Sequence, residues 1–338
     1  MTPQQLKSLI IIASVVAAVL FIFAAVSLVA YITYRMTFMR RRREYDPYFG
    51  LDKPKFAEYS EELSNVIESI SAEDFEPVKI TARDGTKLAG RYYHRCDGAP
   101  IHVICHGYKS SPLRDGSGGG CDSRKMGHNL LLIYQRAHGE SEGETISFGI
   151  LERYDIVDWL NYLTERFGDG AEIILIGTSM GAASVIMAAE LELPDTVKCI
   201  IADSPYSSPK DVILKSVREM GYPAALVYPF IRLGARMFGE FALESASPIT
   251  AIKNAKRSIF IAHGEEDSIV PVEMARLIKA AADEAGVDCT LATFPEAEHC
   301  MSFIVDYERY VNLRNEFLKK HVRALADGEN TTEDNRLL

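Results

Sequence analysis

A serine between two glycines, in Gly177-Thr178-Ser179-Met180-Gly181, constrains the fold of this chain more than any other feature. The apolar run 173–176 before it is typical of a buried strand, and the small residues 182–189 after it are typical of a helix. A strand that turns at once into a helix holds the serine in a strained conformation with its hydroxyl exposed, and it needs glycine where a Cβ would crowd its neighbours. The helix N-terminus adds free N–H groups beside that hydroxyl. We therefore predict that Ser179 is a nucleophile and that Gly177 and Gly181 are structural parts of its turn.

A second serine, Ser141, has the same glycine spacing in Gly139-Glu140-Ser141-Glu142-Gly143 and also follows an apolar run. Its flanks argue against it, because two glutamates would place negative charge beside a developing oxyanion. In addition, no helical pattern opens directly after Gly143. We therefore assign the nucleophile to Ser179 and not to Ser141.

The first 43 residues differ in kind from the rest. Leu9–Thr33 contains 25 residues without a charge, and as a helix it would be roughly 37 Å long, enough to cross a hydrocarbon core of about 30 Å. A cleaved secretory signal is the alternative, but its apolar part would be about 7–15 residues, with a more basic start than Lys7 alone. Basic residues follow the segment at Arg35 and Arg40–Arg43. The positive-inside rule then predicts a single-pass anchor with the remainder of the chain in the cytoplasm.

Charge and cysteine content narrow the possible partners. The first 43 residues carry six basic side chains and no acidic one, so the remainder has 31 basic against 47 acidic residues, a net −16 with His neutral. That balance argues against nucleic acid as a partner. The cysteines show no CxxC or zinc spacing, and we expect no disulfide, metal or cofactor. Cys105 and Cys300 adjoin His106 and His299, which suits a reducing compartment. They are Cys96, Cys105, Cys121, Cys199, Cys289 and Cys300.

The chain divides into the anchor (1–43), a linker and acidic helix (44–72), one α/β domain (73–325) and a polar tail (326–338). In the domain, apolar runs alternate with helical patterns, and the first two flank an Asp84-Gly85 turn. This predicts an eight-stranded, mostly parallel sheet with helices on both faces. We expect Gly116–Gly120 to be a flexible loop, and it is no phosphate cradle because no Gly-Lys-Ser/Thr follows. The expected strands are Val78–Thr81, Lys87–Tyr93, Ile101–Cys105, Asn129–Tyr134, Glu172–Ile176, Val197–Ala202, Ser258–Ala262 and Cys289–Phe294.

A serine nucleophile needs a base that is itself oriented by a carboxylate. Asp267 follows the seventh expected strand and His299 the eighth. Both positions lie where loops leave the carboxyl ends of the strands, the edge at which sites form in open sheets. We predict that Asp267 orients His299, and that His299 takes the Ser179 proton. Asp203, just after the sixth strand, is the alternative acid.

An oxyanion hole needs two N–H donors. Met180 supplies one, because it follows the nucleophile at the start of the helix. The other is expected from the loop after the third strand, Cys105-His106-Gly107-Tyr108, with the N–H of Tyr108 as the donor. Gly107 lets this loop turn, and we interpret His106 as a structural residue that hydrogen-bonds the loop.

Residues 205–243, after the sixth strand, form a connection of 39 residues, where about 2–6 are usual. Its pattern predicts two helices, Pro209–Met220 and Tyr222–Phe238. Its basic residues outnumber its acidic ones by two, although the domain as a whole is acidic. We predict a cap that walls an apolar acyl pocket over Ser179 and faces anionic lipid. The alternative is that its apolar side chains simply cover the sheet.

Together these segments resemble the α/β-hydrolase superfamily, and most of all bacterial hydrolases grouped with its serine aminopeptidase-like and lysophospholipase-like members. The resemblance covers about residues 78–321, while the N-terminal span is absent from many soluble relatives. It implies that the stretch around Ser141 is a structural turn and that the chain has the fold and triad of a serine hydrolase, and it says little about the substrate. Our leading hypothesis is a membrane-anchored serine esterase that cleaves carboxylic esters or thioesters through an acyl-enzyme. A peptidase acting at peptide N-termini, or a binding protein that keeps the fold without catalysis, are the alternatives. The motifs that carry the resemblance are His106-Gly107, Gln135–Gly143, Gly177–Gly181, His263–Asp267 and His299.

Overall fold

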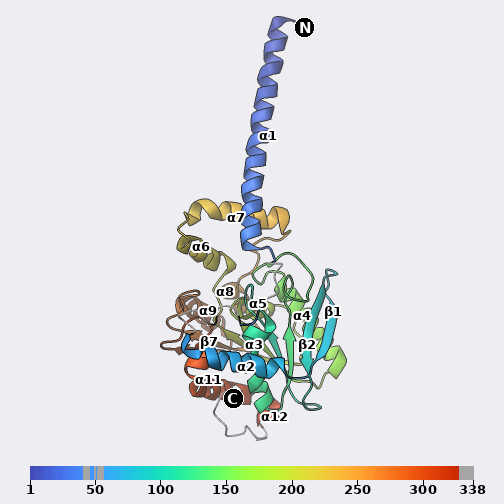
Figure 1. Cartoon of the computed structure of the whole chain (residues 1–338), viewed down its shortest axis with the longest axis vertical. Coiled ribbons are helices and arrows are strands. Elements are labelled where there is room, and N and C mark those ends of the chain that lie inside the picture. The colour runs from blue at the N-terminus through green and yellow to red at the C-terminus, as the bar shows by residue number, and fades with distance from the viewer. Residues whose placement is uncertain (41–45, 49–50, 52–56, 327–338) are drawn as a thin grey trace.

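A computed structural model describes residues 1–40, 46–48, 51 and 57–326 of the 338-residue chain. Most of the predicted linker and the polar tail from residue 327 onward lie outside the described residues. A long helix rises from an α/β domain (Figure 1). The strands are β1 (Glu76–Thr81), β2 (Lys87–Tyr93), β3 (Ile101–Cys105), β4 (Asn129–Ile133), β5 (Ile173–Thr178), β6 (Val197–Asp203), β7 (Ser258–Gly264) and β8 (Cys289–Phe294). The helices are α1 (Pro3–Thr37), η1 (Ala57–Tyr59), α2 (Ser60–Ser71), α3 (Pro112–Lys125), α4 (Glu152–Phe167), α5 (Met180–Ala188), α6 (Pro209–Glu219), α7 (Ala224–Phe238), α8 (Pro248–Ala251), η2 (Ile252–Asn254), α9 (Val272–Ala285), α10 (Ser302–Val305), α11 (Tyr307–His321) and α12 (Arg323–Ala326).

The eight strands form one sheet in the order β1-β2-β4-β3-β5-β6-β7-β8. β2 pairs antiparallel with β1 and with β4, and all the other pairs are parallel. The turn between β1 and β2 contains Gly85 at a φ of 89°, a conformation that favours glycine. The α/β-hydrolase fold with an eight-stranded, mostly parallel sheet is therefore confirmed.

Apolar side chains attach helices to both faces of the sheet. On one face α4, α5 and α9 pack over a cluster that includes the fully buried Trp159. On the other face α11 packs Tyr310 and Phe317 against Phe260 of β7, and α2 and α3 pack near Ile104 of β3. The carboxyl ends of the parallel strands are left to loops, and those loops carry the candidate site.

The prediction of a flexible loop at Gly116–Gly120 is wrong, because these residues lie inside α3. Glycine weakens a helix interior by about 1 kcal/mol per residue relative to alanine, so the local sequence argues against a helix. Packing decides otherwise, because a Cβ at Gly116 would come within 2.7 Å of Leu132 and one at Gly119 within 2.8 Å of Ile104. The glycines therefore let the helix lie close to the sheet, and Ser111 caps its N-terminus.

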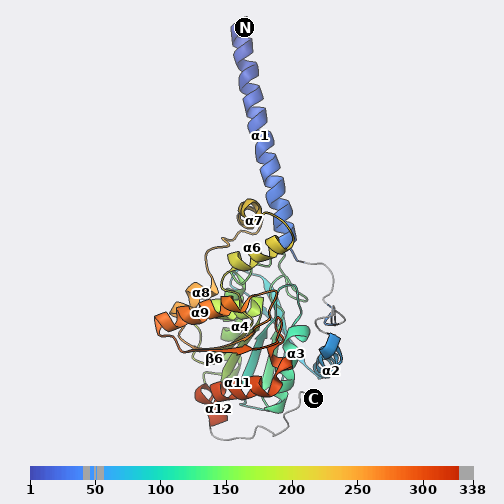
Figure 2. The ribbon, with the colours of Figure 1, turned by 90° about the vertical axis from the view of Figure 1, so that its left-hand side faces the viewer.

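The insertion between β6 and α8 forms two helices, α6 and α7, close to their predicted bounds. α7 lies across the base of α1 (Figures 1 and 2). A Cβ on Gly234 of α7 would come within 2.4 Å of the Ala30 carbonyl oxygen, so only glycine permits this crossing. The buried apolar side chains of the insertion pack with Tyr34 and Phe38 at the end of α1, and with Phe148. The insertion thus shares an apolar core with the end of α1.

Candidate active site

Ser179 stands between β5 and α5 with a φ of 55°, a left-handed conformation that is uncommon for a residue with a side chain. Its two glycine neighbours have no room for a side chain. A Cβ on Gly177 would come within 2.4 Å of the Gly181 backbone, and one on Gly181 within 2.0 Å of the Cys105 carbonyl oxygen. The turn expected from the pentapeptide is therefore present, and packing against β3 maintains its strain.

The structure brings Ser179, His299 and Asp267 together, although 120 residues separate the serine from the histidine. His299 Nε2 lies 2.9 Å from Ser179 Oγ, and His299 Nδ1 lies 2.7 Å from Asp267 Oδ2. The loops that carry the histidine and the aspartate follow β8 and β7. Such a chain can move a proton from a serine hydroxyl to an imidazole and stabilise the imidazolium that forms.

The Asp267 carboxylate is buried and fully hydrogen-bonded. Oδ1 accepts from the backbone N–H groups of Ile269 at 2.9 Å and Val270 at 2.7 Å. Burial by itself would raise the pKa of this carboxyl, but hydrogen bonds from His263, His299 and Val270 outweigh it and hold the pKa well below its usual value. Asp267 is therefore ionised at neutral pH, as an acid that orients a histidine must be.

His263 is a supporting residue to which sequence reasoning assigned no role. Its side chain is fully buried, and Nε2 lies 2.7 Å from the Val270 carbonyl oxygen and 3.3 Å from Asp267 Oδ2. It therefore holds both ends of the turn that presents the Asp267 carboxylate. The signal was a histidine at the end of β7, four residues before the acid.

Asp203, the alternative acid, contacts the turn of the serine and not the histidine. Its carbonyl oxygen accepts from the Ser179 N–H at 2.8 Å, and its Oδ1 accepts from Ser204 Oγ at 3.0 Å. Burial raises the pKa of Asp203 to about 6. The geometry therefore gives the histidine-orienting position to Asp267.

The two predicted oxyanion residues lie on segments that meet at the serine. Met180 is the first residue of α5. Tyr108 is on the loop after β3, and a Cβ on the preceding Gly107 would be only 3.3 Å from Ser179 Cβ. The Gly107 N–H donates to Asp115 Oδ2 at 2.7 Å, which fixes the course of this loop.

Two buried histidines hold the loop after β3. His106 Nδ1 lies 2.8 Å from the Gly107 carbonyl oxygen, and its Nε2 accepts from the Gln135 N–H at 3.1 Å. His138 Nε2 accepts from the Lys109 N–H at 3.1 Å. Burial lowers the pKa of both imidazoles, so they are neutral at pH 7. Sequence reasoning gave His106 this structural role and left His138 without one.

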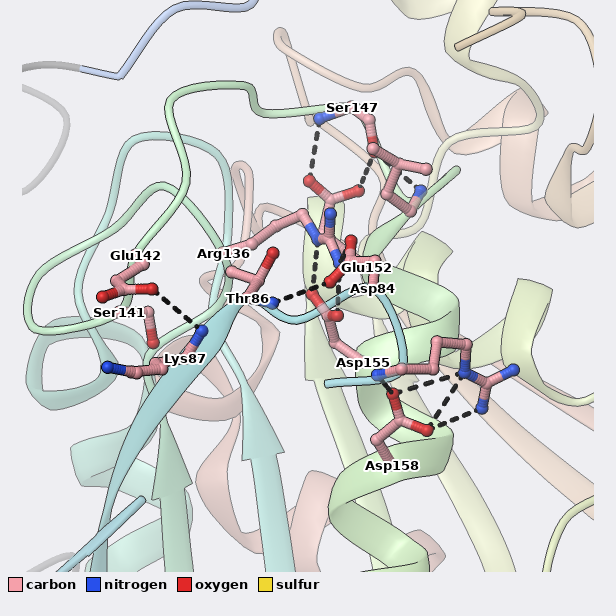
Figure 3. A network of polar contacts seen from close by, with 12 residues as sticks. Asp84, Thr86, Lys87, Arg136, Ser141, Glu142, Ser147, Glu152, Asp155 and Asp158 are labelled. Atoms are coloured by element: carbon pink, nitrogen blue, oxygen red, sulfur yellow. Dashed lines mark hydrogen bonds and ion pairs between the residues drawn. The ribbon is translucent and has the colours of Figure 1, made fainter. Parts of the chain in front are cut away.

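Ser141, the competing serine, belongs to a structural network (Figure 3). It is 1% exposed, and its hydroxyl donates to the Tyr134 carbonyl oxygen at 2.6 Å while accepting from the Ala89 N–H at 2.9 Å. Close by, Arg136 makes ion pairs with Asp155 and with Asp84 at the β1–β2 turn. The segment around Ser141 therefore fastens the loop after β4 to the antiparallel edge of the sheet.

A cavity of about 710 Å³ opens beside Ser179 and His299. Its walls come from β3, β5, β6, α2, α3, α10 and α11, and no residue of 205–243 is among its lining residues. The insertion was predicted to wall a pocket over the serine, but it does not line this cavity. The insertion also does more than cover the sheet, because it packs on the end of α1.

No group of three or more His, Cys, Asp or Glu side chains among the described residues is arranged to hold a metal ion. Ser179 and His299 lie beside the cavity, whose volume suits a small organic ligand.

Comparison with known proteins agrees with this geometry. The sequence profile of the prolyl oligopeptidase family (Peptidase_S9) matches residues 149–324, more than half of the chain and a span that includes Ser179, Asp267 and His299. The uncharacterized protein YqkD of Bacillus subtilis (strain 168) is 23% identical over 262 residues, which cover 75% of this chain and 82% of that protein.

Solved structures share the fold at low sequence identity. The Pyrococcus furiosus esterase Pf2001 superposes with a TM-score of 0.59 at 24% identity, over 75% of this chain and 95% of that chain. The Pyrococcus horikoshii acylaminoacyl peptidase gives 0.56 at 18% identity, over 80% of this chain and 45% of that chain.

Proposed function

This chain belongs to the prolyl oligopeptidase family, and from that premise we propose that it is a membrane-anchored hydrolase of carboxylic esters or thioesters. Family and fold make it a serine hydrolase of the α/β-hydrolase type. The roles of the individual residues, the ester substrate and the membrane anchor are the proposal. The observation that supports it most is the hydrogen-bonded chain from Asp267 through His299 to Ser179.

In this mechanism Ser179 Oγ attacks the substrate carbonyl carbon while His299 Nε2 takes the hydroxyl proton. Asp267 keeps the proton of the resting imidazole on Nδ1 and stabilises the imidazolium. The backbone N–H groups of Met180 and Tyr108 stabilise the oxyanion of the tetrahedral intermediate. His299 then donates the proton to the leaving alcohol or thiol, and a water molecule that it deprotonates hydrolyses the acyl-enzyme and restores Ser179.

A peptidase is the second candidate, and the family match itself favours it, as does the likeness to an acylaminoacyl peptidase. Both reactions pass through an acyl-enzyme, so the same residues would act. They differ in the leaving group, which is an amine in one case and an alcohol or thiol in the other.

The experiment uses the full-length protein in detergent. We expect a fluorophosphonate probe to label the wild type and not Ser179→Ala, because the probe phosphonylates an activated serine. Ser141→Ala, the matched control, should be labelled like the wild type. Labelling of a well-folded Ser179→Ala would disprove the nucleophile assignment, and an unlabelled wild type would favour a binding protein without catalysis.

The same preparations decide between ester and peptide bonds. We expect hydrolysis of p-nitrophenyl esters and little hydrolysis of aminoacyl or N-acylaminoacyl p-nitroanilides. The reverse order of kcat/KM would assign the enzyme to peptide bonds and leave the serine mechanism in place.

The proposed anchor is α1. Among the described helices it is the one long and apolar enough to cross a bilayer, and no residue of its 18-residue apolar window is buried. The span leads directly into the catalytic domain, because the Phe38 carbonyl oxygen accepts from the Ile146 N–H and the Arg40 guanidinium donates to the Ser141 carbonyl oxygen. The predicted cytoplasmic orientation depends on the basic residues that follow the span. Three of them, Arg41–Arg43, lie outside the described residues.

We place α6 and α7 against the anionic leaflet of this membrane. α7 crosses α1 at Gly234 and Ala30, where the span leaves the bilayer, so its free side faces the lipid surface. Exposed apolar side chains together with an excess of basic residues suit such a surface. The exposed apolar residues are Met220, Tyr222, Leu226, Met237 and Phe238.

A further inference from the structure

The cavity beside Ser179 runs down one face of the sheet, away from the insertion. Its floor contains Ile104, Ile176 and Ile201, which lie side by side because Ile104 pairs with Ile176 and Ile176 pairs with Ile201. The wall beside this floor includes Gly118 and Gly119 of α3, where the helix lies close to Ile104 and to Phe303 of α10. An apolar channel therefore begins at the catalytic serine.

The far end of this channel is closed by buried polar groups. His102, Asp122 and Arg314 line it, and each is less than 5% exposed. Arg314 forms an ion pair with Asp122, and His102 Nε2 lies 3.0 Å from His128 Nδ1. An apolar chain that reached these groups would bury against paired charges, which sets a limit to its length.

The register of the sheet gives the length of the channel. His102 pairs with Ile174, five residues before Ser179 on the same strand and turn. At a rise of about 3.3 Å per residue this corresponds to roughly 16 Å. A fully extended chain advances about 1.2 Å per bond, since the three backbone bonds of a residue span about 3.5 Å. The channel therefore accommodates about 13 bonds, a chain of about 12–14 carbons.

We propose that this channel is the acyl-chain site, and that it holds the unbranched acyl group of the substrate throughout the reaction. The inference rests on the proposed ester hydrolysis. The leaving group has to depart before water can attack, whereas the acyl group stays attached to Ser179 Oγ. A channel closed at its far end suits the part that stays.

Gly119→Leu provides the test, because a Cβ there already comes within 2.8 Å of Ile104 Cδ1 and a larger side chain must enter the channel. The contact is with the far end of a flexible side chain, which can shift, and leucine favours a helix more than glycine does. Gly120→Ala is the matched control in the same helix, since Gly120 does not line the cavity and its added Cβ would meet Leu130 and Ile70. Phe303→Ala widens the channel from the α10 side.

The assay is kcat/KM for p-nitrophenyl esters of 2 to 16 carbons, with a parallel series of acetate esters of longer alcohols. We expect a wild-type optimum at about 12–14 carbons. Gly119→Leu should keep acetate hydrolysis within about threefold and lower dodecanoate hydrolysis by at least about tenfold, since a misfit of one methylene is already worth about 10–200-fold. Gly120→Ala should keep the wild-type profile, and Phe303→Ala should shift the optimum to longer chains.

An unchanged chain-length profile in both channel variants would overturn the proposal, and so would a length dependence confined to the alcohol series. If Gly119→Leu does not fold, the direction of the Phe303→Ala shift decides alone. Probe labelling and acetate hydrolysis are measured separately from the chain-length profile. Absence of both in the wild type would refute the proposed function, whereas normal labelling with an unchanged chain-length profile would refute only the acyl-chain site.

Discussion

Replacing Ser141 by alanine should destabilise the protein without impairing catalysis. Ser179→Ala should instead abolish catalysis and leave the protein folded. The Ser141 hydroxyl stands between two backbone groups at the end of the β2–β4 pairing, the Ala89 N–H and the Tyr134 carbonyl. Alanine fills neither hydrogen-bonding role. The substitution therefore leaves a buried donor and a buried acceptor without this partner.

The magnitude follows from the desolvation of those groups. A buried polar group that loses its partner costs about 1–3 kcal/mol. Ala89 is 3% exposed, so water cannot easily replace the hydroxyl there, and we expect a loss of about 2 kcal/mol. For a domain of this size about 1 kcal/mol corresponds to about 2–4 °C, so Tm should fall by about 4–8 °C.

The assay is thermal unfolding of full-length protein in detergent, with ester turnover measured well below Tm. Ser184→Ala is the matched control, because this buried hydroxyl only donates to the Met180 carbonyl oxygen one helical turn earlier, and its loss leaves no N–H unpaired. It should change Tm by less than about 2 °C, because a substitution that leaves no buried group unpaired usually changes the free energy of unfolding by no more than about 0.5 kcal/mol. An equal Tm loss in both variants would refute the unpaired-group reasoning, and lost turnover in a folded Ser141→Ala would refute its structural assignment.

Four further outcomes are expected. Asp267→Asn should lower kcat by about 10⁴, because the asparagine stabilises the wrong tautomer of His299; an equal loss in a folded Asp203→Asn protein would reverse the two roles. Burial raises the pKa of Asp203 from 3.8 to about 6, so the wild type should lose stability relative to Asp203→Asn as pH rises from about 4 to about 6, measured by chemical denaturation, and a flat difference would contradict this. External protease on intact cells should leave the catalytic domain undigested, and digestion would place it outside. Anionic vesicles should raise turnover of medium-chain esters by the wild type but not by Leu226→Glu, and equal responses would argue against a lipid-facing α7.

The parts that could be predicted from sequence are those encoded in short segments. The alternation of apolar runs with helical patterns led to the eight-stranded sheet, because strand and helix periodicity are local properties. The turn at Ser179 followed from two glycines whose contacts lie within the same strand and helix or on the adjacent strand. Chain order and strand context selected Asp267 and His299, which the structure brings within hydrogen-bonding distance; their catalytic roles stay predictions.

Other features depend on contacts between segments far apart in the chain. Gly234 matters only because α7 crosses α1 at Ala30, and nothing in either segment specifies that crossing. The run Gly116–Gly120 has the composition of a loop, yet close packing on the sheet makes it a helix. The channel was missed for the same reason, since its walls come from elements spread from α2 to α11 and none of them alone encodes a cavity. Local sequence thus determined the strands, the serine turn and the chain order of the proposed catalytic groups, whereas tertiary packing decided where α1 is joined to the domain and where the cavity lies.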